Sequence, residues 1–166
     1  MQLLRENHCS KKVVNHCKAV AGLALETASA LEMRGFKIDF ALVEAGALLH
    51  DIGRSKTHSV HHAVVGAEIA ESAGLPDSVV AIIKRHVGGG ITASEAEELG
   101  WPKDVYVPVT LEEKVVAYAD KLIEKGKRAP IDITVEKLEA ERKLEAAERV
   151  RKLYDEITGL MSVDPT

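Results

Sequence analysis

Apolar residues recur every three or four positions along most of this chain, which is the spacing of an amphipathic helix. The longest such stretch predicts a helix over 11–33, with Ser10 as its N-cap and Gly35 just beyond its end. A stretch over 40–51 is apolar almost all round and is therefore expected at the centre of a bundle. The same spacing predicts further helices over about 3–7, 61–73, 77–86, 94–99, 110–124 and 134–160.

This pattern predicts an all-α fold, and the composition agrees with it. Hydrophobic residues make up 46% of the chain but aromatic residues only 4%, whereas a β-sandwich uses more aromatic and β-branched side chains. No repeat or linker composition divides the 166 residues, so we expect a single domain over 1–166. Its core is predicted over about 11–125, with a C-terminal helical extension over about 133–160.

Charge and cysteine content narrow the function classes. The net charge of −4 argues against general binding of nucleic acids or of anionic membranes. A phosphate-bearing substrate would therefore need a local positive site. The two cysteines, Cys9 and Cys17, are expected to be free thiols rather than a disulfide framework. We find no signal peptide or membrane span in the sequence, which predicts a cytoplasmic protein.

Several polar residues lie on faces that are otherwise apolar. His16, His86 and Asp120 each have apolar neighbours three, four or seven positions away on the same helical face. A single histidine in such a place is more often a core residue than a ligand, but a buried carboxylate requires a partner. Several such residues converging from separate helices are most simply satisfied by a shared divalent cation.

The dipeptide His50-Asp51 closes the central apolar helix. In the last turn of a helix both side chains can turn toward one ion, and we expect Gly53 to end the helix in the left-handed conformation. The local sequence leaves an alternative open, in which Asp51 begins the following turn and His50 bonds a carbonyl of the helix end.

Taken together, His16, His50-Asp51 and Asp120 form the ordered pattern H…HD…D, and the local string at His50–Arg54 reads HDIGR. This pattern resembles the HD-domain metal-dependent phosphohydrolase superfamily. The strings LVEAGALLHDIGRS, HHAVVGAEIAESAGLP and VVAYADKL look like those of its small stand-alone HDIG-type proteins. The resemblance covers about residues 11–125, and it implies an HD-type helical bundle with a metal site in its core.

The resemblance also implies a ligand set for one or two divalent ions. His16, His50, Asp51 and Asp120 match the shared ligands, and Asp51 is the one able to bridge two ions. A second ion would add His62 and His86, with His61 as the competing register for His62. Nitrogen and oxygen ligands suit Mn, Fe, Co, Ni, Zn or Mg, and the sequence does not choose among them. His58 and His8 are expected to be solvated.

For function, the resemblance implies hydrolysis of a phosphate monoester or diester, with a nucleotide as the expected substrate. A metal-activated water would attack, Asp51 would orient it or take its proton, and Arg54 and Arg85 would bind substrate phosphate. The alternative is a catalytically silent module of the same fold that senses a metal and a nucleotide. No GYP signature follows His86, where the chain reads VGGGIT, so cleavage of cyclic-di-GMP is disfavoured.

Two features remain open at the level of sequence. Gly88 to Gly90 either line a pocket or only end a helix. The last helix carries apolar residues that fit packing on the bundle or on a second subunit of a homodimer, namely Val150, Leu153, Ile157 and Leu160.

Overall fold

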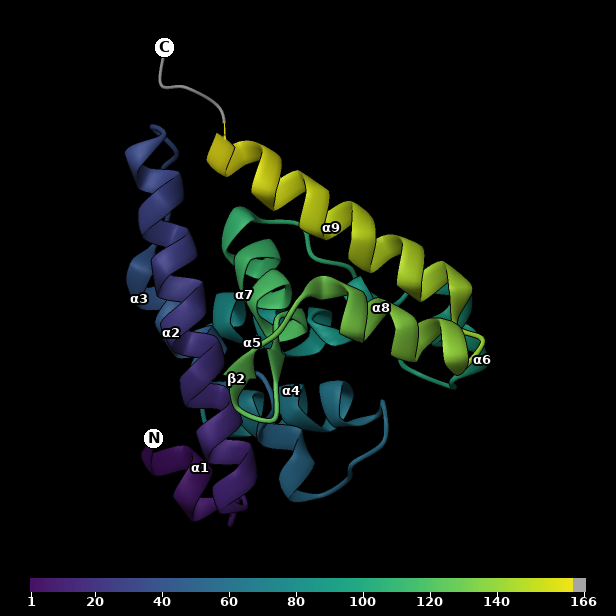
Figure 1. Ribbon diagram of the computed structural model, residues 1–166. Coiled ribbons are helices and arrows are strands. Elements are labelled where there is room, and N and C mark those ends of the chain that lie inside the picture. The colour runs from purple at the N-terminus through teal and green to yellow at the C-terminus, as the bar shows by residue number, and fades with distance from the viewer. Residues whose placement is uncertain (163–166) are drawn as a thin grey trace.

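The computed structural model describes residues 1–162 and consists of helices with one short hairpin (Figure 1). This confirms the all-α prediction. The last four residues of the predicted domain 1–166 lie outside the described residues. The α-helices are α1 (Gln2–Glu6), α2 (Lys11–Met33), α3 (Phe40–Leu49), α4 (His62–Ser72), α5 (Asp77–Arg85), α6 (Ala93–Glu98), α7 (Leu111–Lys121), α8 (Ile131–Ala140) and α9 (Leu144–Ser162). Two 3-10 helices and two strands complete the set: η1 (Ile52–Ser55), η2 (Val87–Gly89), β1 (Ile123–Glu124) and β2 (Lys127–Arg128).

Side-chain caps fix the starts of several helices where the sequence predicts them. The Ser10 hydroxyl accepts a hydrogen bond from the backbone N–H of Val13 at the start of α2. Asp39 does the same for α3 through the N–H of Leu42. Thr110 forms a capping box with its N3 residue at the start of α7, which satisfies two backbone donors at once.

The main core lies where α7 passes between the two long helices α2 and α9 (Figure 1). Small residues such as Ala24 on α2 and Ala119 on α7 are fully buried, which lets the helices approach closely. Leu153 and Ile157 of α9 belong to the same cluster. The apolar face of α9 therefore packs on the bundle, which is one of the two arrangements that its sequence allowed.

The predicted helix over 134–160 is wrong as a single element. The chain turns at Arg142, whose φ is +60°, and α8 and α9 pack against each other on either side of that turn. No glycine or proline marks this turn, since the residues there are charged helix formers. Turning back lets Val135 of α8 bury itself against Ala147 and Val150 of α9, and this packing outweighs local helix propensity.

The predicted helix over 110–124 is also too long. Helix α7 ends at Lys121, and the chain then forms the antiparallel pair β1–β2 with Ile123 opposite Arg128. Lys125 and Gly126 connect the strands, and both have positive φ, which matches the twist of a two-residue hairpin. Among residues 1–162 no helix has the length and apolar character needed to cross a bilayer.

Candidate metal centre

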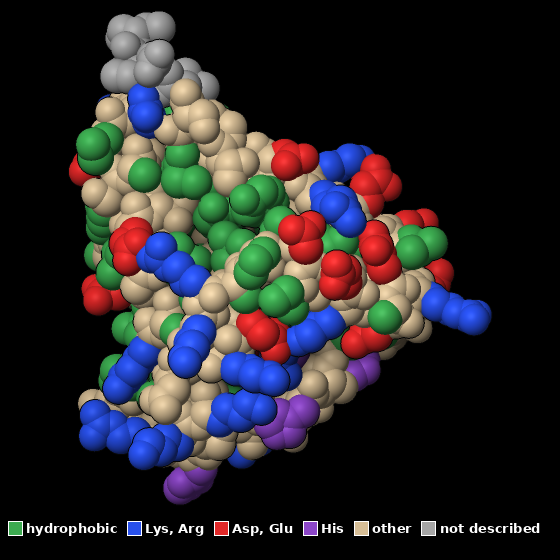
Figure 2. All heavy atoms as spheres, viewed as in Figure 1, with side chains coloured by type: hydrophobic (Ala, Val, Ile, Leu, Met, Phe, Trp, Pro, Cys, Tyr) green, Lys and Arg blue, Asp and Glu red, His purple; other side chains and the backbone are tan. Residues whose placement is uncertain are grey.

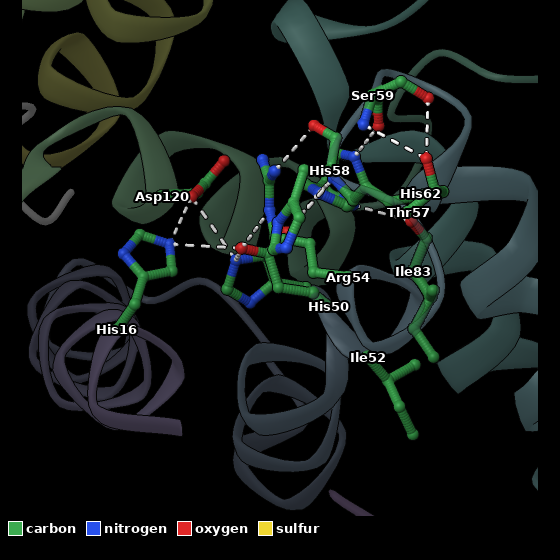
Figure 3. Close-up of polar contacts among 12 residues, drawn as sticks. His16, His50, Ile52, Arg54, Thr57, His58, Ser59, His62, Ile83 and Asp120 are labelled. Atoms are coloured by element: carbon green, nitrogen blue, oxygen red, sulfur yellow. Dashed lines mark hydrogen bonds and ion pairs between the residues drawn. The ribbon is translucent and has the colours of Figure 1, made fainter. Parts of the chain in front are cut away.

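Four of the predicted ligands meet where α2, α3 and α7 come together (Figure 3). Nε2 of His16 lies 3.0 Å from Oδ1 of Asp120 and 3.7 Å from Oδ2 of Asp51. Nε2 of His50 lies 3.3 Å from the same oxygen of Asp120 and 3.7 Å from Oδ2 of Asp51. The side chain of His50 is fully buried, whereas that of His16 is 22% exposed, so His16 lies on the solvent side of the group.

A second group of ligand atoms lies on the other side of Asp51. Nε2 of His62, the first residue of α4, is 3.1 Å from Oδ1 of Asp51. Nε2 of His86, at the end of α5, is 3.4 Å from the same oxygen. The ligand atoms of Asp51, His62 and His86 all lie within 4.8 Å of one another, as do those of His16, His50 and Asp51. Asp51 thus directs one carboxylate oxygen to each group of histidines.

Three of the imidazole rings are oriented by backbone carbonyls. Nδ1 of His50 lies 2.7 Å from the carbonyl oxygen of Ala47, and Nδ1 of His62 and His86 make equivalent contacts of 2.7 and 2.6 Å with the residues three positions before them. A carbonyl only accepts, so each Nδ1 carries the proton and donates it. In a neutral ring this leaves Nε2 unprotonated, with a free lone pair. In all three rings Nε2 points into the cluster.

These lone pairs lack suitable partners within the protein. Nε2 of His50 is buried and has no hydrogen-bond partner among the described residues. Nε2 of His62 and Nε2 of His86 lie 3.1 Å apart, facing one another. Two neutral imidazoles that both donate through Nδ1 cannot hydrogen-bond through Nε2, so a proton or a cation must lie between them. The donor set of imidazole nitrogens and carboxylate oxygens fits a divalent cation in this place.

Electrostatics keep the two carboxylates ionised. Burial raises the pKa of Asp51, but the positive charge of His50 and hydrogen bonds from neighbouring imidazoles outweigh it, so this pKa lies well below its ordinary value. The pKa of Asp120 also lies well below its ordinary value, because the positive charge of Lys121 and the neighbouring imidazoles of His16 and His50 outweigh burial. Both acids therefore present the charged form that binds a cation.

The pKa values of the two fully buried histidines, His50 and His86, are shifted in opposite directions. Burial lowers the pKa of His86 to about 4, so its ring is neutral at pH 7. Burial also acts to lower the pKa of His50, but the charge of Asp51 outweighs it and raises that pKa well above its ordinary value.

Gly53 determines how closely α4 approaches the end of α3. The sequence predicts a left-handed Gly53, but it has no positive φ, and this prediction is wrong. A Cβ at this position would overlap the carbonyl oxygen of His62 and would lie 2.7 Å from the backbone nitrogen of Gly66. Glycine is thus required because two backbone segments touch here, and that contact brings His62 to Asp51.

Cationic side chains contact the Oδ2 atoms of both acids. Nε of Arg54 donates to Oδ2 of Asp51 at 2.9 Å, and the guanidinium also reaches the carbonyl of His58 at 3.2 Å. Nζ of Lys121 lies 2.5 Å from Oδ2 of Asp120. Arg54 is 31% exposed, so it connects the buried cluster with solvent.

The remaining predicted residues lie elsewhere. The Nε1–H of Trp101 donates to Nδ1 of the exposed His61 at 2.7 Å, so of the two registers it is His62 that faces the cluster. The guanidinium of Arg85 contacts both oxygens of the buried Glu113, at 2.9 and 3.1 Å, and Arg85 does not line the cavity described next. Its predicted role in substrate binding is therefore not retained. His8 and His58 are exposed, as expected.

A cavity of about 610 Å³ opens from the cluster to solvent. His16, Asp51 and Asp120 form its floor, and Arg54, Lys12, Lys121, Lys125 and Lys137 are among its lining residues. Figure 2 shows Lys and Arg side chains gathered over the N-terminal half of α2 and the β1–β2 hairpin, while acidic side chains are frequent over α8 and α9. This net-acidic protein therefore has a local positive rim beside the cluster.

Sequence reasoning missed the lysines of this rim, although two of them carry a signal. Lys12 precedes His16 by four residues on α2, and Lys121 directly follows Asp120, so both positions could be placed next to a predicted ligand. Lys125 reaches the cavity from the hairpin turn, which the helical pattern did not predict.

The fold and the cluster define the class of this protein. Residues 13–125, more than half of the chain, match the family model of the HD domain, so the protein belongs to the HD-domain family. HD domains bind divalent metals, and the family is one of metal-dependent phosphohydrolases. The His and Asp groups in the core are of the kind that such a metal requires.

Individual relatives come from archaea and bacteria. The chain is 47% identical over 158 residues to an uncharacterised protein of Methanocaldococcus jannaschii, and 94% of each chain is covered. It is 37% identical to a tRNA (cytidine(56)-2'-O)-methyltransferase of Picrophilus torridus over 99% of this chain, but it spans only 47% of the length of that relative. The HD domain of the L. monocytogenes phosphodiesterase PgpH in complex with cyclic-di-AMP shares the fold, with a TM-score of 0.60 and 17% identity over 100% of both chains.

Proposed function

We propose that this protein hydrolyses a phosphate monoester or diester of a nucleotide at a divalent-metal centre in the core of its HD domain. The observation that carries the proposal is that the two oxygens of Asp51 face different histidines. Oδ1 faces His62 and His86, and Oδ2 faces His16 and His50. A carboxylate with separate histidine partners on each oxygen is suited to join two cation sites.

In this proposal the ligands divide into two sets that share Asp51. His16, His50 and Asp120 would hold one ion, and His62 and His86 would hold the other. A divalent cation held there would lower the pKa of a water molecule and neutralise charge on a phosphoryl oxygen. The donor atoms suit several metals, from Mn, Fe, Co and Ni to Zn or Mg, and we do not choose among them.

The protein's own groups would position the substrate. Because Asp51 is nine-tenths or more buried and contacts four imidazoles, its role is to hold and orient groups at the centre rather than to exchange with solvent. Arg54 stands at the mouth with N–H groups to spare and would bind a phosphoryl oxygen. Lys12 and Lys125 line the same cavity and would neutralise further phosphate charge.

A nucleotide is the substrate class that the site supports best. The cavity of about 610 Å³ is of the size that small-molecule sites have, and its rim is positive. The similar HD domain of PgpH is described as a phosphodiesterase in complex with cyclic-di-AMP, which is a nucleotide. This likeness supports the substrate class, and the identity of the base and the number of phosphates stay open to experiment.

A catalytically silent metal- and nucleotide-binding module is the second candidate. It is favoured by one finding, namely that the Picrophilus torridus methyltransferase contains a region like this chain within a protein about twice as long. A module of that kind would bind a metal and a nucleotide with the same residues and would not turn the nucleotide over.

The first test combines metal analysis with a substrate panel. Wild-type protein loaded with Mn or Zn should retain about two ions per chain by mass spectrometry, while His50→Ala and Asp51→Ala should each lose metal. The loaded protein should hydrolyse members of a panel of nucleoside monophosphates, cyclic nucleotides and bis-(p-nitrophenyl) phosphate. Far-UV circular dichroism of each variant shows whether it is folded.

The outcomes separate the candidates. Metal binding without turnover of any panel member favours the silent module. Wild-type protein that retains no metal from any of the tested cations would refute both, because each requires the cluster to hold a cation.

A further inference from the structure

A second cavity of about 910 Å³ lies beside the first and is not explained by the metal centre. It is bounded by α6, η2, α8 and the start of α9, and no predicted metal ligand lines it. Lys121, Thr134 and Leu138 line both cavities, so these side chains form a wall that the two cavities share. The second cavity therefore begins one residue along the chain from Asp120.

The wall between the cavities is held in place from both sides. The Thr134 hydroxyl donates to the carbonyl oxygen of Lys121 at 2.8 Å, which ties the first turn of α8 to the end of α7. The Lys121 ammonium in turn lies 2.5 Å from Oδ2 of Asp120 and is only 14% exposed. A cation is thus fixed where the cavities adjoin, close to the place proposed for the scissile phosphate.

The far wall of the second cavity has the character of a small-molecule site. Val60, Val87, Ile91 and Leu99 supply apolar surface. Thr92, Ser94 and Glu98 add polar atoms that can hydrogen-bond a ligand. Glu95 is engaged elsewhere, since both of its oxygens lie 2.9 Å from the guanidinium of Arg149, and this pair joins α6 to α9 across the cavity.

Glycine shapes the floor of this cavity. Gly88 lines it with a φ of +58°, and Gly89 follows with a φ of +69°. A Cβ at Gly89 would lie 3.1 Å from the backbone of Arg149, so the loop and α9 approach closely there. Gly88 thus lines this second cavity, whereas none of Gly88 to Gly90 lines the cavity at the metal centre.

We infer that this second cavity is the subsite for the base of the nucleotide substrate, with the phosphate at the metal centre and Lys121 between them. The inference rests on the proposed function and adds to it the place where specificity is determined. A flat heterocycle has apolar faces and a hydrogen-bonding edge, which the mixed lining accommodates, and the shared wall places it next to the phosphate end of the substrate.

Much of this subsite lies outside the part of the chain that matches the family model. Eight of the eighteen residues that line the cavity, from Thr134 to Arg149, come from α8, the turn after it and α9, whereas the match ends at residue 125. Base specificity would therefore be set in large part by these two helices and not by the metal-binding core.

The test compares two probes that differ only in the base. Metal-loaded wild-type protein is titrated calorimetrically with AMP and with ribose 5-phosphate. AMP should bind at least about tenfold more tightly, since the base contributes contacts that the sugar phosphate lacks. Where the loaded protein turns these two probes over, their KM values take the place of the calorimetric affinities in the comparison.

Two double variants on α6 give a matched pair. Ser94→Met/Glu98→Met places two long side chains at positions that line the cavity, and the advantage of AMP over ribose 5-phosphate should fall to about threefold or less. Ala93→Met/Glu97→Met makes the same addition at the same spacing on the same helix. These two residues are exposed and do not line the cavity, so the AMP advantage should remain at its wild-type value.

Equal affinity of wild-type protein for AMP and ribose 5-phosphate would overturn the inference while leaving the proposed function intact. An unchanged ratio in the Ser94/Glu98 variant, or an equal loss in the Ala93/Glu97 variant, would overturn it as well. A wild-type protein that binds neither probe and hydrolyses no ester of the panel would instead show that the proposed function itself is wrong.

Discussion

At the scale of the residue, the candidate metal centre depends on both carboxylate oxygens of Asp51. Asp51 contacts four imidazoles, two in each group of histidines, and one guanidinium. Its position at the end of α3 follows from the dipeptide His50-Asp51, which the sequence identified. The contact that sequence alone could not establish is that of Arg54, which folds back onto Asp51 within η1.

Arg54→Ala should weaken substrate binding more than metal binding. Loss of the guanidinium removes a charged donor at the cavity mouth, which is worth about 1.5 kcal/mol or more, so KM for a hydrolysed ester should rise by about tenfold. Steady-state kinetics at saturating metal, with metal content measured in parallel, checks this. Lys56→Ala is the control, because Lys56 is exposed two residues away and does not line the cavity. An unchanged KM in Arg54→Ala would contradict the role given to this residue.

At the scale of the element, helix ends deliver the ligands. His50 follows α3, His62 begins α4 and His86 follows α5. Asp120 is the last residue but one of α7, and only His16 projects from the interior of a long helix, α2. The latter two were predictable, because a polar residue interrupts an apolar face. The choice of His62 over His61 needed the structure, since adjacent residues start the same helix and only the contact of α4 with η1 determines which one turns inward.

Gly53→Ala should disturb that contact. The added methyl group would overlap the carbonyl of His62, and relieving such overpacking costs about 1–3 kcal/mol, which corresponds to a loss of roughly 2–12 °C in Tm for a domain of this size. Metal stoichiometry should also fall, because His62 moves away from Asp51. Thermal unfolding and metal analysis measure the two effects.

Gly22→Ala is the matched control for this substitution. A Cβ at Gly22, in the exposed middle of α2, meets nothing within 4 Å, so alanine there should keep or raise Tm and leave metal content unchanged. If the two variants had the same Tm and metal content, the close approach of α4 to η1 would not be the reason for glycine at residue 53.

At the scale of the whole molecule, the ligand cluster and the apolar packing occupy different parts of the core. The packed clusters of apolar side chains extend away from the ligands along α2, α7 and α9 and along α4 and α5. Helix positions were predictable because apolar residues recur with the helical period, and the ligand set was predictable because the order H…HD…D resembles that of a known family. The turn at Arg142 and the hairpin at β1–β2 were not, because their stability comes from packing between distant segments and no breaker residue marks the first of them.

Removing metal should therefore lower stability without unfolding the protein. A cation present at about a hundred times its Kd contributes about 2.7 kcal/mol, so chelation should lower Tm by about 5 °C or more while far-UV circular dichroism at 25 °C stays helical. Asp51→Ala, which lacks the shared ligand, should not respond to the chelator. Loss of helical signal on chelation would contradict the separation of apolar packing and ligand cluster.

Main-chain carbonyls orient the imidazoles of His50, His62 and His86, and this affects which substitutions the protein tolerates at the residues that supply those carbonyls. Ala47, Ser59 and Ile83 hold the three rings through main-chain oxygens, which every amino acid possesses. Replacing any of these residues by another of similar volume therefore alters no anchor. Sequence drift at the buried Ala47 and Ile83 is thus limited by packing, and at Ser59 by the hydrogen bonds of its hydroxyl to Thr57 and His61.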